Sequence, residues 1–174
     1  MSEELRIELD KWIRENWDPE ASVQEWWHRL SSAGFSNPGL PEPFGKGWSR
    51  SETRVLASAL RESGAIGSPA GVGLMLAAPT ILSHGTDEQI AKYVPSILNG
   101  TDSWCQLFSE PGAGSDLAGL QTKAVRDGDE WVITGQKVWT SEGQNADYGM
   151  LIARTDPNAA KHRGISSYAF PRNQ

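Results

Sequence analysis

The segment of this chain best suited to bind a ligand is a glycine-rich turn at residues 110–116, Glu-Pro-Gly-Ala-Gly-Ser-Asp. The turn follows a short apolar run at residues 104–109 and ends in a hydroxyl and a carboxylate. Glycine tolerates positive φ and lets a ligand approach the backbone, so we expect the amides around Gly112 and Gly114 to form an anion-binding concavity. The turn therefore predicts contact with a cofactor or an anionic ligand.

Taken alone, the turn also has other interpretations. A short pattern of this kind is more often an ordinary turn than a ligand site. It is not a Walker A loop, because no Gly-Lys-Ser/Thr follows, and Leu117 stands where the dinucleotide fingerprint has its third glycine. Glu110 could serve as a base, but a structural role at the turn is favoured.

The remaining reactive side chains give weaker signals. Cys105 lies in the apolar run, which is typical of a buried small hydrophobe and not of a nucleophile. Trp139, one of eight tryptophans, would on its own be expected in the core. The histidines are far apart and lack ligand spacing, so no metal site is predicted. They are His28, His84 and His162.

Composition narrows the class of protein. The 174 residues, 38% of them hydrophobic, suffice for one large or two small domains. A net charge of −6 and the lack of a long basic block argue against nucleic acid as a partner, and an anionic ligand would need local basic groups. A single cysteine, an acidic start and the absence of an apolar run of roughly 20 residues predict a cytoplasmic protein without signal peptide or membrane span.

The first hundred residues have the periodicity of helices. Apolar residues recur at helical spacing over residues 5–17, and Asp18-Pro19 has the pattern of a helix start. Residues 72–82 are nearly all apolar and predict a buried helix interrupted at Pro79. Three further helices are predicted by capping-box patterns. These are Ser22-x-x-Glu25, Ser49-x-x-Glu52 and Thr86-x-x-Gln89.

After Gly100 the pattern changes to that of strands. Strands are predicted at residues 104–109, 148–154 and 164–170. Asp127-Gly128-Asp129 predicts a hairpin between residues 122–126 and 131–134, and a second turn at Thr134-Gly135 leads into residues 137–141. Helices followed by strands indicate an α+β arrangement or two domains, with a boundary near residues 100–103.

The order of three motifs resembles that of the acyl-CoA dehydrogenase family. The motifs are Ala-Pro-Thr-Ile-Leu-Ser-His-Gly-Thr-Asp-Glu-Gln-Ile, then Leu-Phe-Ser-Glu-Pro-Gly-Ala-Gly-Ser-Asp, then Gly-Asp-Glu-Trp-Val-Ile-Thr-Gly-Gln-Lys-Val-Trp-Thr-Ser. The likeness runs from about residue 26 to the end and is densest over residues 79–170. No single motif is unique to the family, but their order makes a chance similarity improbable.

The resemblance implies a multi-domain fold of α and β parts. An all-α helical domain is expected at residues 1–102, and an incomplete, antiparallel β-barrel-like middle domain at residues 103–174. The family's C-terminal four-helix domain is expected to be absent. The implied activity is that of an FAD-dependent oxidoreductase of lipid metabolism acting on CH–CH donors: a proton leaves the α-carbon of an acyl-CoA and a hydride passes from the β-carbon to flavin N5. The implied partners are an electron-transferring flavoprotein and further subunits of an oligomer.

The resemblance also assigns cofactor contacts. Eight residues match cofactor-binding positions of the family: Gln106, Phe108, Ser109, Gly114, Ser115, Trp139, Thr140 and Ser141. Ser115 also matches a position that contacts the acyl-CoA substrate. Trp139 matches a tryptophan packed against the flavin, and Ser141 matches a residue that reaches flavin N5. Many members have threonine where Ser109 stands, and serine keeps the hydroxyl.

No catalytic residue can be assigned in this chain. In most of the family the base is a glutamate of the C-terminal domain, so the resemblance implies that this chain alone is inactive and that its own hold on FAD is doubtful. A cut, proteolysed or naturally short product stays open. So do a noncatalytic subunit that associates with a full-length relative, and a related flavin oxidase or monooxygenase. Acyl chain length and branching are not predicted; residues 74–78 could line the substrate pocket or belong to the core.

Overall fold

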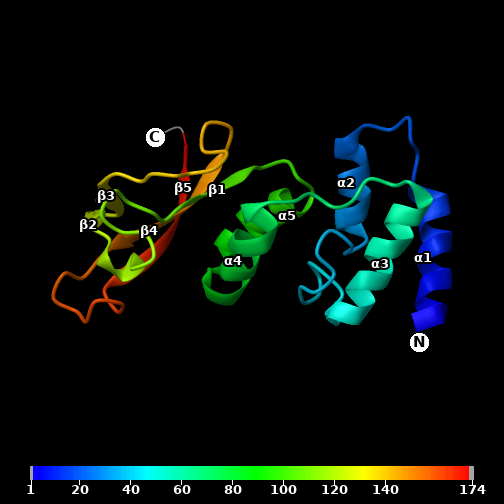
Figure 1. Cartoon of the computed structure of the whole chain (residues 1–174), viewed down its shortest axis with the longest axis horizontal. Helices are drawn as coiled ribbons and strands as arrows, with labels where there is room; N and C mark the ends of the chain where they lie inside the picture. The colour runs from blue at the N-terminus through cyan, green and yellow to red at the C-terminus, as the bar shows by residue number, and fades with distance from the viewer. Residues whose placement is uncertain (1, 173–174) are drawn as a thin grey trace. The chain divides into compact units, whose positions relative to one another are not determined.

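The computed structural model describes residues 2–172 and divides the chain into two compact units, Met1–Thr101 and Asp102–Gln174 (Figure 1). The first unit is helical and the second contains a five-stranded sheet. The predicted order of helices followed by strands is confirmed. Each unit is described separately below.

The helical unit begins its helices where the capping patterns predict. Its α-helices are α1 (Ser2–Asn16), α2 (Val23–Ser32), α3 (Arg50–Ser63), α4 (Ala78–His84) and α5 (Asp87–Leu98). Ser22, Ser49 and Thr86 cap α2, α3 and α5, and each forms both hydrogen bonds of a capping box. The helix start expected at Asp18-Pro19 is wrong, because α2 begins only after the Ser22 cap.

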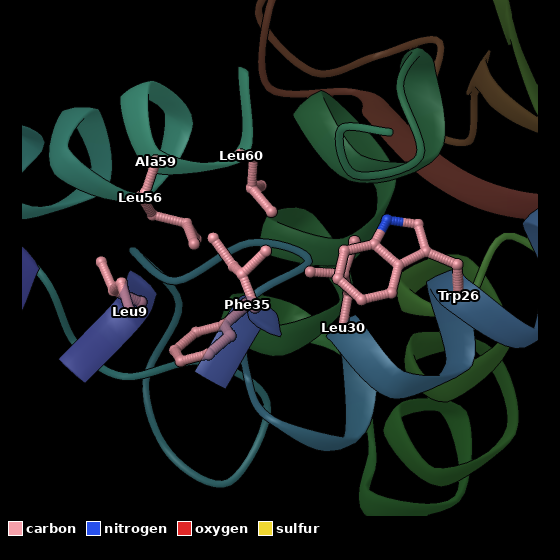
Figure 2. Packing of buried hydrophobic residues seen from close by; sticks show 8 residues of the cluster. Leu9, Trp26, Leu30, Phe35, Leu56, Ala59 and Leu60 are labelled. Atoms are coloured by element: carbon pink, nitrogen blue, oxygen red, sulfur yellow. The ribbon is translucent and has the colours of Figure 1, made fainter. Parts of the chain in front are cut away.

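One hydrophobic cluster joins α1, α2 and α3. Figure 2 shows Leu9 of α1, Trp26 and Leu30 of α2, and Leu56 and Leu60 of α3 directed toward a shared interior. Trp26 and Leu30 are about 1% exposed or less. The Trp26 indole also donates to the carbonyl oxygen of Ile66 at 2.6 Å. Burial of these aromatic and aliphatic side chains stabilises the packing of the three helices.

The apolar stretch at residues 72–82 differs from its prediction. It forms a π-helical turn, Gly73–Ala77, that leads directly into α4. Pro79 lies in the first turn of α4, and the carbonyl oxygen of Leu74, five residues earlier, accepts the Asn37 side-chain amide at 3.2 Å. The expectation of a wholly buried helix is wrong for Met75, whose side chain is 81% exposed.

The second unit is built around one long central strand. Its strands are β1 (Trp104–Leu107), β2 (Lys123–Asp127), β3 (Glu130–Thr134), β4 (Tyr148–Arg154) and β5 (Ile165–Pro171). The predicted hairpin is confirmed as β2 paired with β3, and β5 pairs antiparallel with all of β4. The sheet is mixed and not purely antiparallel, because β1 and β2 run parallel to β4. Turn signals reveal only pairings between consecutive strands, so no local signal predicts these parallel pairs.

β1 and β2 share one edge of β4. β5 occupies the other edge along the full length of β4. β1 lies beside residues 148–151, whereas β2 meets β4 only where Lys123 pairs with Arg154. The chain therefore leaves this edge after Leu107 and returns to it at Lys123. Residues 108–122, which include the glycine-rich turn, form an excursion whose two ends are fixed to the same strand.

Candidate functional site

Two segments that the sequence separates lie side by side at the end of β1. The backbone N–H of Val138 donates to the carbonyl oxygen of Ser109 at 2.9 Å. The ammonium group of Lys137 donates to the carbonyl oxygen of Phe108, also at 2.9 Å. The structure thus brings the candidate residue Ser109 next to the segment that carries Trp139.

A buried ion pair fixes the same place. The Lys137 ammonium donates to the Glu110 carboxylate at 2.9 Å, and the two side chains are 8% and 5% exposed. The carboxylate also accepts the backbone N–H groups of Gln121 at 2.6 Å and Thr122 at 2.9 Å. The structural role predicted for Glu110 is confirmed. Lys137 was missed, because one lysine in a polar stretch of sequence has the pattern of a surface residue.

The environment of Glu110 is unsuited to proton abstraction. Burial raises the pKa of this carboxyl, but Thr122, the Gln121 N–H and the Lys137 ammonium outweigh that effect and lower the pKa to about 2. The carboxylate is therefore ionised at neutral pH, with its oxygens engaged by three donors. A group held in this way orders the backbone around it.

The glycine-rich turn is open to solvent. Glu110 and Ala113 exchange backbone hydrogen bonds of 2.9 and 3.1 Å, and Ala113 is buried. Gly112, Gly114 and Ser115 are exposed. Neither glycine uses the positive φ that its residue type permits, and a Cβ on either one would meet open space. The two glycines therefore keep the space above the turn open, and neither residue has a left-handed backbone conformation.

Phe108 lies beneath the turn and not on its surface. Its ring packs against the buried cluster of Ala113, Leu120 and Ile152. Since Lys137 occupies its carbonyl oxygen, Phe108 supports the turn from below. Gln106, two residues earlier on β1, is exposed, and Ser109 is half-buried.

Among the described residues, Trp139 is the most exposed of the large apolar side chains, at 92%. The core position expected for this residue on its own is therefore wrong. Its φ of 58° lies in the left-handed region, as does the φ of 60° at Glu142. Non-glycine residues adopt this region rarely, and backbone strain of this kind concentrates at functional sites. Thr140 is half-buried and Ser141 is exposed between the two strained positions.

The loop that carries Trp139 is anchored at both ends. Lys137 and Val138 hold its first residues to β1. At the other end the carbonyl oxygen of Glu142 accepts the N–H groups of Asn145 at 2.9 Å and Ala146 at 3.0 Å. The fixed ends leave the indole ring as the projecting part of the loop.

A basic pocket of about 590 Å³ lies between residues 118–125 and 154–161 of the same unit. Lys123, Arg154 and Lys161 contribute positive charge to its lining. Arg154 donates to the carbonyl oxygens of Ala118 at 2.7 Å and Lys161 at 3.1 Å, so its guanidinium ties the two walls together. Lys161 pairs with Asp116 of the glycine-rich turn. These cations are the local basic groups that an anionic ligand of an acidic chain requires.

The structure gives no support, among residues 2–172, for a metal site, a membrane-spanning helix or a reactive cysteine. Within that range no cluster of His, Cys, Asp and Glu could hold a metal ion, and no helix is long and apolar enough to cross a membrane. Cys105 is buried, as predicted, and burial raises the pKa of its thiol. A thiol in that state is a poor nucleophile.

Comparisons with known sequences agree across the whole described chain. Residues 1–101 match the family model "Acyl-CoA dehydrogenase, N-terminal domain", and residues 105–174 match "Acyl-CoA dehydrogenase, middle domain". The chain is 50% identical over 139 residues to acyl-CoA dehydrogenase FadE34 of Mycobacterium tuberculosis, covering 80% of this chain and 19% of that protein. It is 34% identical over 190 residues to acyl-CoA dehydrogenase IpdE1 of the same organism, covering 99% and 49%.

Solved structures give the same result. The structure named "Tcur3481-Tcur3483 steroid ACAD" superposes with a TM-score of 0.70 at 40% identity, covering 98% of this chain and 46% of that one. The ChsE4-ChsE5 complex from Mycobacterium tuberculosis superposes with a TM-score of 0.73 at 38% identity, covering 99% and 46%. The chain spans about half the length of these relatives, or less. It belongs to the acyl-CoA dehydrogenase family.

Proposed function

We propose that this chain supplies part of the FAD and acyl-CoA site of an acyl-CoA dehydrogenase, which removes hydrogen from the α and β carbons of an acyl-CoA thioester. The observation that carries the proposal is the exposed indole of Trp139, held by a strained loop beside Ser109. A tryptophan that is 92% exposed, in a loop with left-handed backbone at two non-glycine residues, is unusual unless its ring has a partner. A flat aromatic ligand provides that partner.

The exposed residues fit a flavin. The Trp139 indole offers a broad face for stacking, and the hydroxyls of Ser109 and Ser141 can hydrogen-bond the polar edge of a ring system. Gln106 and Thr140 add polar groups on the same two segments. When bound, FAD would supply the hydride acceptor, a role that amino-acid side chains do not fill.

The glycine-rich turn is proposed to face the substrate. The open space above Gly112 and Gly114 lets a ligand reach the backbone, and the exposed Ser115 hydroxyl lies beside it. Phe108 and the Glu110 hydrogen bonds hold the turn from below. The turn would therefore bind and orient the acyl thioester without itself moving a proton.

The basic pocket is proposed to receive the phosphate groups of coenzyme A. Lys123 and Lys161 offer ammonium groups at its surface, and Arg154 keeps its walls together. Charge-assisted hydrogen bonds to phosphate are stronger than neutral ones. The pairing of Lys161 with Asp116 links this pocket to the glycine-rich turn, so both parts of one ligand can be held by the same unit.

We propose that this chain alone does not dehydrogenate acyl-CoA. The buried carboxylate beside the site, Glu110, has its pKa lowered to about 2 and is engaged by three donors. A general base works best with a pKa near the operating pH. The base would then come from outside the described residues, and the electrons would leave to an electron-transferring flavoprotein.

Two solved relatives suggest the substrate and the partner. One is named a steroid ACAD, and both are named by two gene products each. The structure named a steroid ACAD, 40% identical over 98% of the chain, favours a steroid-linked acyl-CoA as substrate. Both structures favour assembly with a second chain of the same family.

Titration of ligands tests the proposed function. FAD binding is followed by flavin fluorescence, and coenzyme A binding by calorimetry, with the chain alone and with a co-expressed family member. We expect Trp139→Ala to weaken FAD binding, and the double variant Lys123→Ala/Lys161→Ala to weaken coenzyme A binding, each at least ten-fold. Pantetheine, which lacks the nucleotide phosphates, should bind both proteins equally. Unchanged affinities in these variants, or no binding of either ligand by any assembly, would contradict the proposal.

A further inference from the structure

The Lys137–Glu110 ion pair reaches four segments of the sheet unit at once. Lys137 contacts the end of β1 through the Phe108 carbonyl, and Glu110 begins the glycine-rich turn. The same carboxylate holds Gln121 and Thr122 at the entrance to β2. Lys137 itself lies two residues before Trp139. No other ion pair found among the described residues is buried on both sides.

Stability alone does not explain why a charged pair, and not an apolar pair, occupies this buried position. Burying two charges removes both from water, and an apolar pair of similar volume often stabilises a fold equally well. What an apolar pair does not provide is direction: an ammonium group and a carboxylate fix the donors and acceptors around them. The pair spans the two segments whose relative placement sets where Trp139 projects.

The strained loop needs such an anchor. The left-handed φ values at Trp139 and Glu142 persist only if the surrounding contacts impose them. On the Glu142 side the hydrogen bonds to Asn145 and Ala146 provide this. On the other side the contacts are Val138 to Ser109 and Lys137 to its two acceptors.

We propose that Lys137 and Glu110 are positioning residues that set the Trp139 loop in register with the glycine-rich turn. The inference rests on the proposed function for the identity of the ligand, but the register itself is a property of the chain alone. The Lys137 side chain holds Val138 against Ser109, and Glu110 holds the turn to which Ser115 belongs. One ion pair thus orients both halves of the candidate site.

Amide hydrogen exchange tests the register without any ligand. In the wild-type chain the Val138 N–H should exchange slowly, because it donates to Ser109. In Lys137→Met, which keeps the length of the side chain but removes its charge and donors, the Val138 amide should exchange at least ten-fold faster. The amides of β4 and β5 should change by less than two-fold. The control Arg126→Met removes one positive charge from an exposed side chain of the same unit. It should change neither the exchange of the Val138 amide nor that of the β4 and β5 amides.

A second readout follows the indole. The fluorescence of Trp139 is obtained as the difference between each protein and its Trp139→Phe variant. We expect Lys137→Met to shift the emission or the acrylamide quenching of this component, and Arg126→Met to leave both unchanged. If Lys137→Met does not fold, Glu110→Gln is measured in the same way, with the same local acceleration expected.

Three outcomes would overturn the positioning role. The first is fast exchange of Val138 in the wild-type chain. The second is unchanged exchange of Val138 in a folded Lys137→Met or Glu110→Gln variant. The third is acceleration of Val138 only in step with β4 and β5, which would make the pair a general stabiliser. FAD binding is read separately: a correct register together with absent FAD binding would refute the proposed function and leave the register intact.

Discussion

The Glu110 carboxylate accepts the backbone N–H of Thr122 at 2.9 Å, which joins the first residue of the glycine-rich turn to the residue that enters β2. This contact closes the base of the excursion at residues 108–122. Because Phe108 and Leu120 also meet in one buried cluster, the excursion is closed by both polar and apolar contacts. The turn is therefore a supported structure and not a loose loop.

The Glu110 contacts predict an acid-sensitive sheet unit. The pKa of the Glu110 carboxyl is lowered from 4.5 to about 2. The contribution of this carboxylate to stability is therefore complete above pH 4.5 and is lost as the pH falls toward 2. We expect the free energy of unfolding, measured with urea, to fall over that range. In Glu110→Gln the stability at neutral pH should be lower and this part of the pH dependence weaker. Glu130→Gln, an exposed carboxyl on β3, should follow the wild type. Parallel profiles for Glu110→Gln and the wild type would contradict the assignment.

Two glycines of the same unit should differ in how much an alanine substitution destabilises the fold. A Cβ on Gly135 would lie 2.3 Å from the Thr122 Oγ1 atom and 2.7 Å from its Cα, so the backbone must shift. We expect Gly135→Ala to lower the free energy of unfolding by about 1–3 kcal/mol. Gly114→Ala meets open space and should change stability by less than about 0.5 kcal/mol, yet weaken ligand binding at the turn. Equal stabilities of the two variants in urea unfolding would refute this prediction.

Trp139 should matter for binding and not for folding. Its side chain is 92% exposed, so Trp139→Ala should change the free energy of unfolding by less than about 0.5 kcal/mol. Trp139→Gly should be more stable than Trp139→Ala by about 1 kcal/mol, because glycine adopts a φ of 58° without a Cβ clash. Chemical denaturation of both variants gives this difference. A Trp139→Ala variant that unfolds far more easily would show instead that the ring packs within the unit.

The α3 cap gives a prediction for the helical unit. The Ser49 hydroxyl accepts the Glu52 N–H at 3.3 Å, and the Glu52 carboxylate accepts the Ser49 N–H at 2.8 Å. We expect Ser49→Ala to lower the thermal stability of this unit by about 1 kcal/mol, and Ser49→Asp, also a good cap, to restore most of it. The stability of both variants is measured by thermal denaturation of the full chain, followed by the helical circular dichroism signal, which comes mainly from residues 1–101. A Ser49→Ala variant as stable as the wild type would mean that the cap is dispensable.

Local signals predicted most of the fold. The capping boxes at Ser22, Ser49 and Thr86 each mark a helix start, because the pattern contains both hydrogen-bonding partners. Asp127-Gly128-Asp129 marks the hairpin for the same reason: Gly128 has a φ of 60° in the turn. Features of this kind depend on residues close together in the sequence.

What the sequence did not reveal depends on distant partners. The parallel pairing of β1 with β4, the burial of Lys137 and the exposure of Trp139 all follow from contacts across many residues. Composition places lysine outside and tryptophan inside, and here both are reversed. Nor does the sequence show which property of Gly112 and Gly114 the turn uses: they leave room above the backbone, and neither adopts a positive φ.

The edge of β4 shared by β1 and β2 has a consequence for the order of folding during synthesis. The first unit is translated before the sheet unit, and the β2–β3 hairpin is local, so both can form as the chain emerges from the ribosome. β1 pairs only with residues 148–151, which are translated well after it. Until they emerge, the backbone groups of β1 stay unpaired and the sheet cannot be completed. The nascent chain therefore passes through a stage in which β1 is open to chaperones and to other strands.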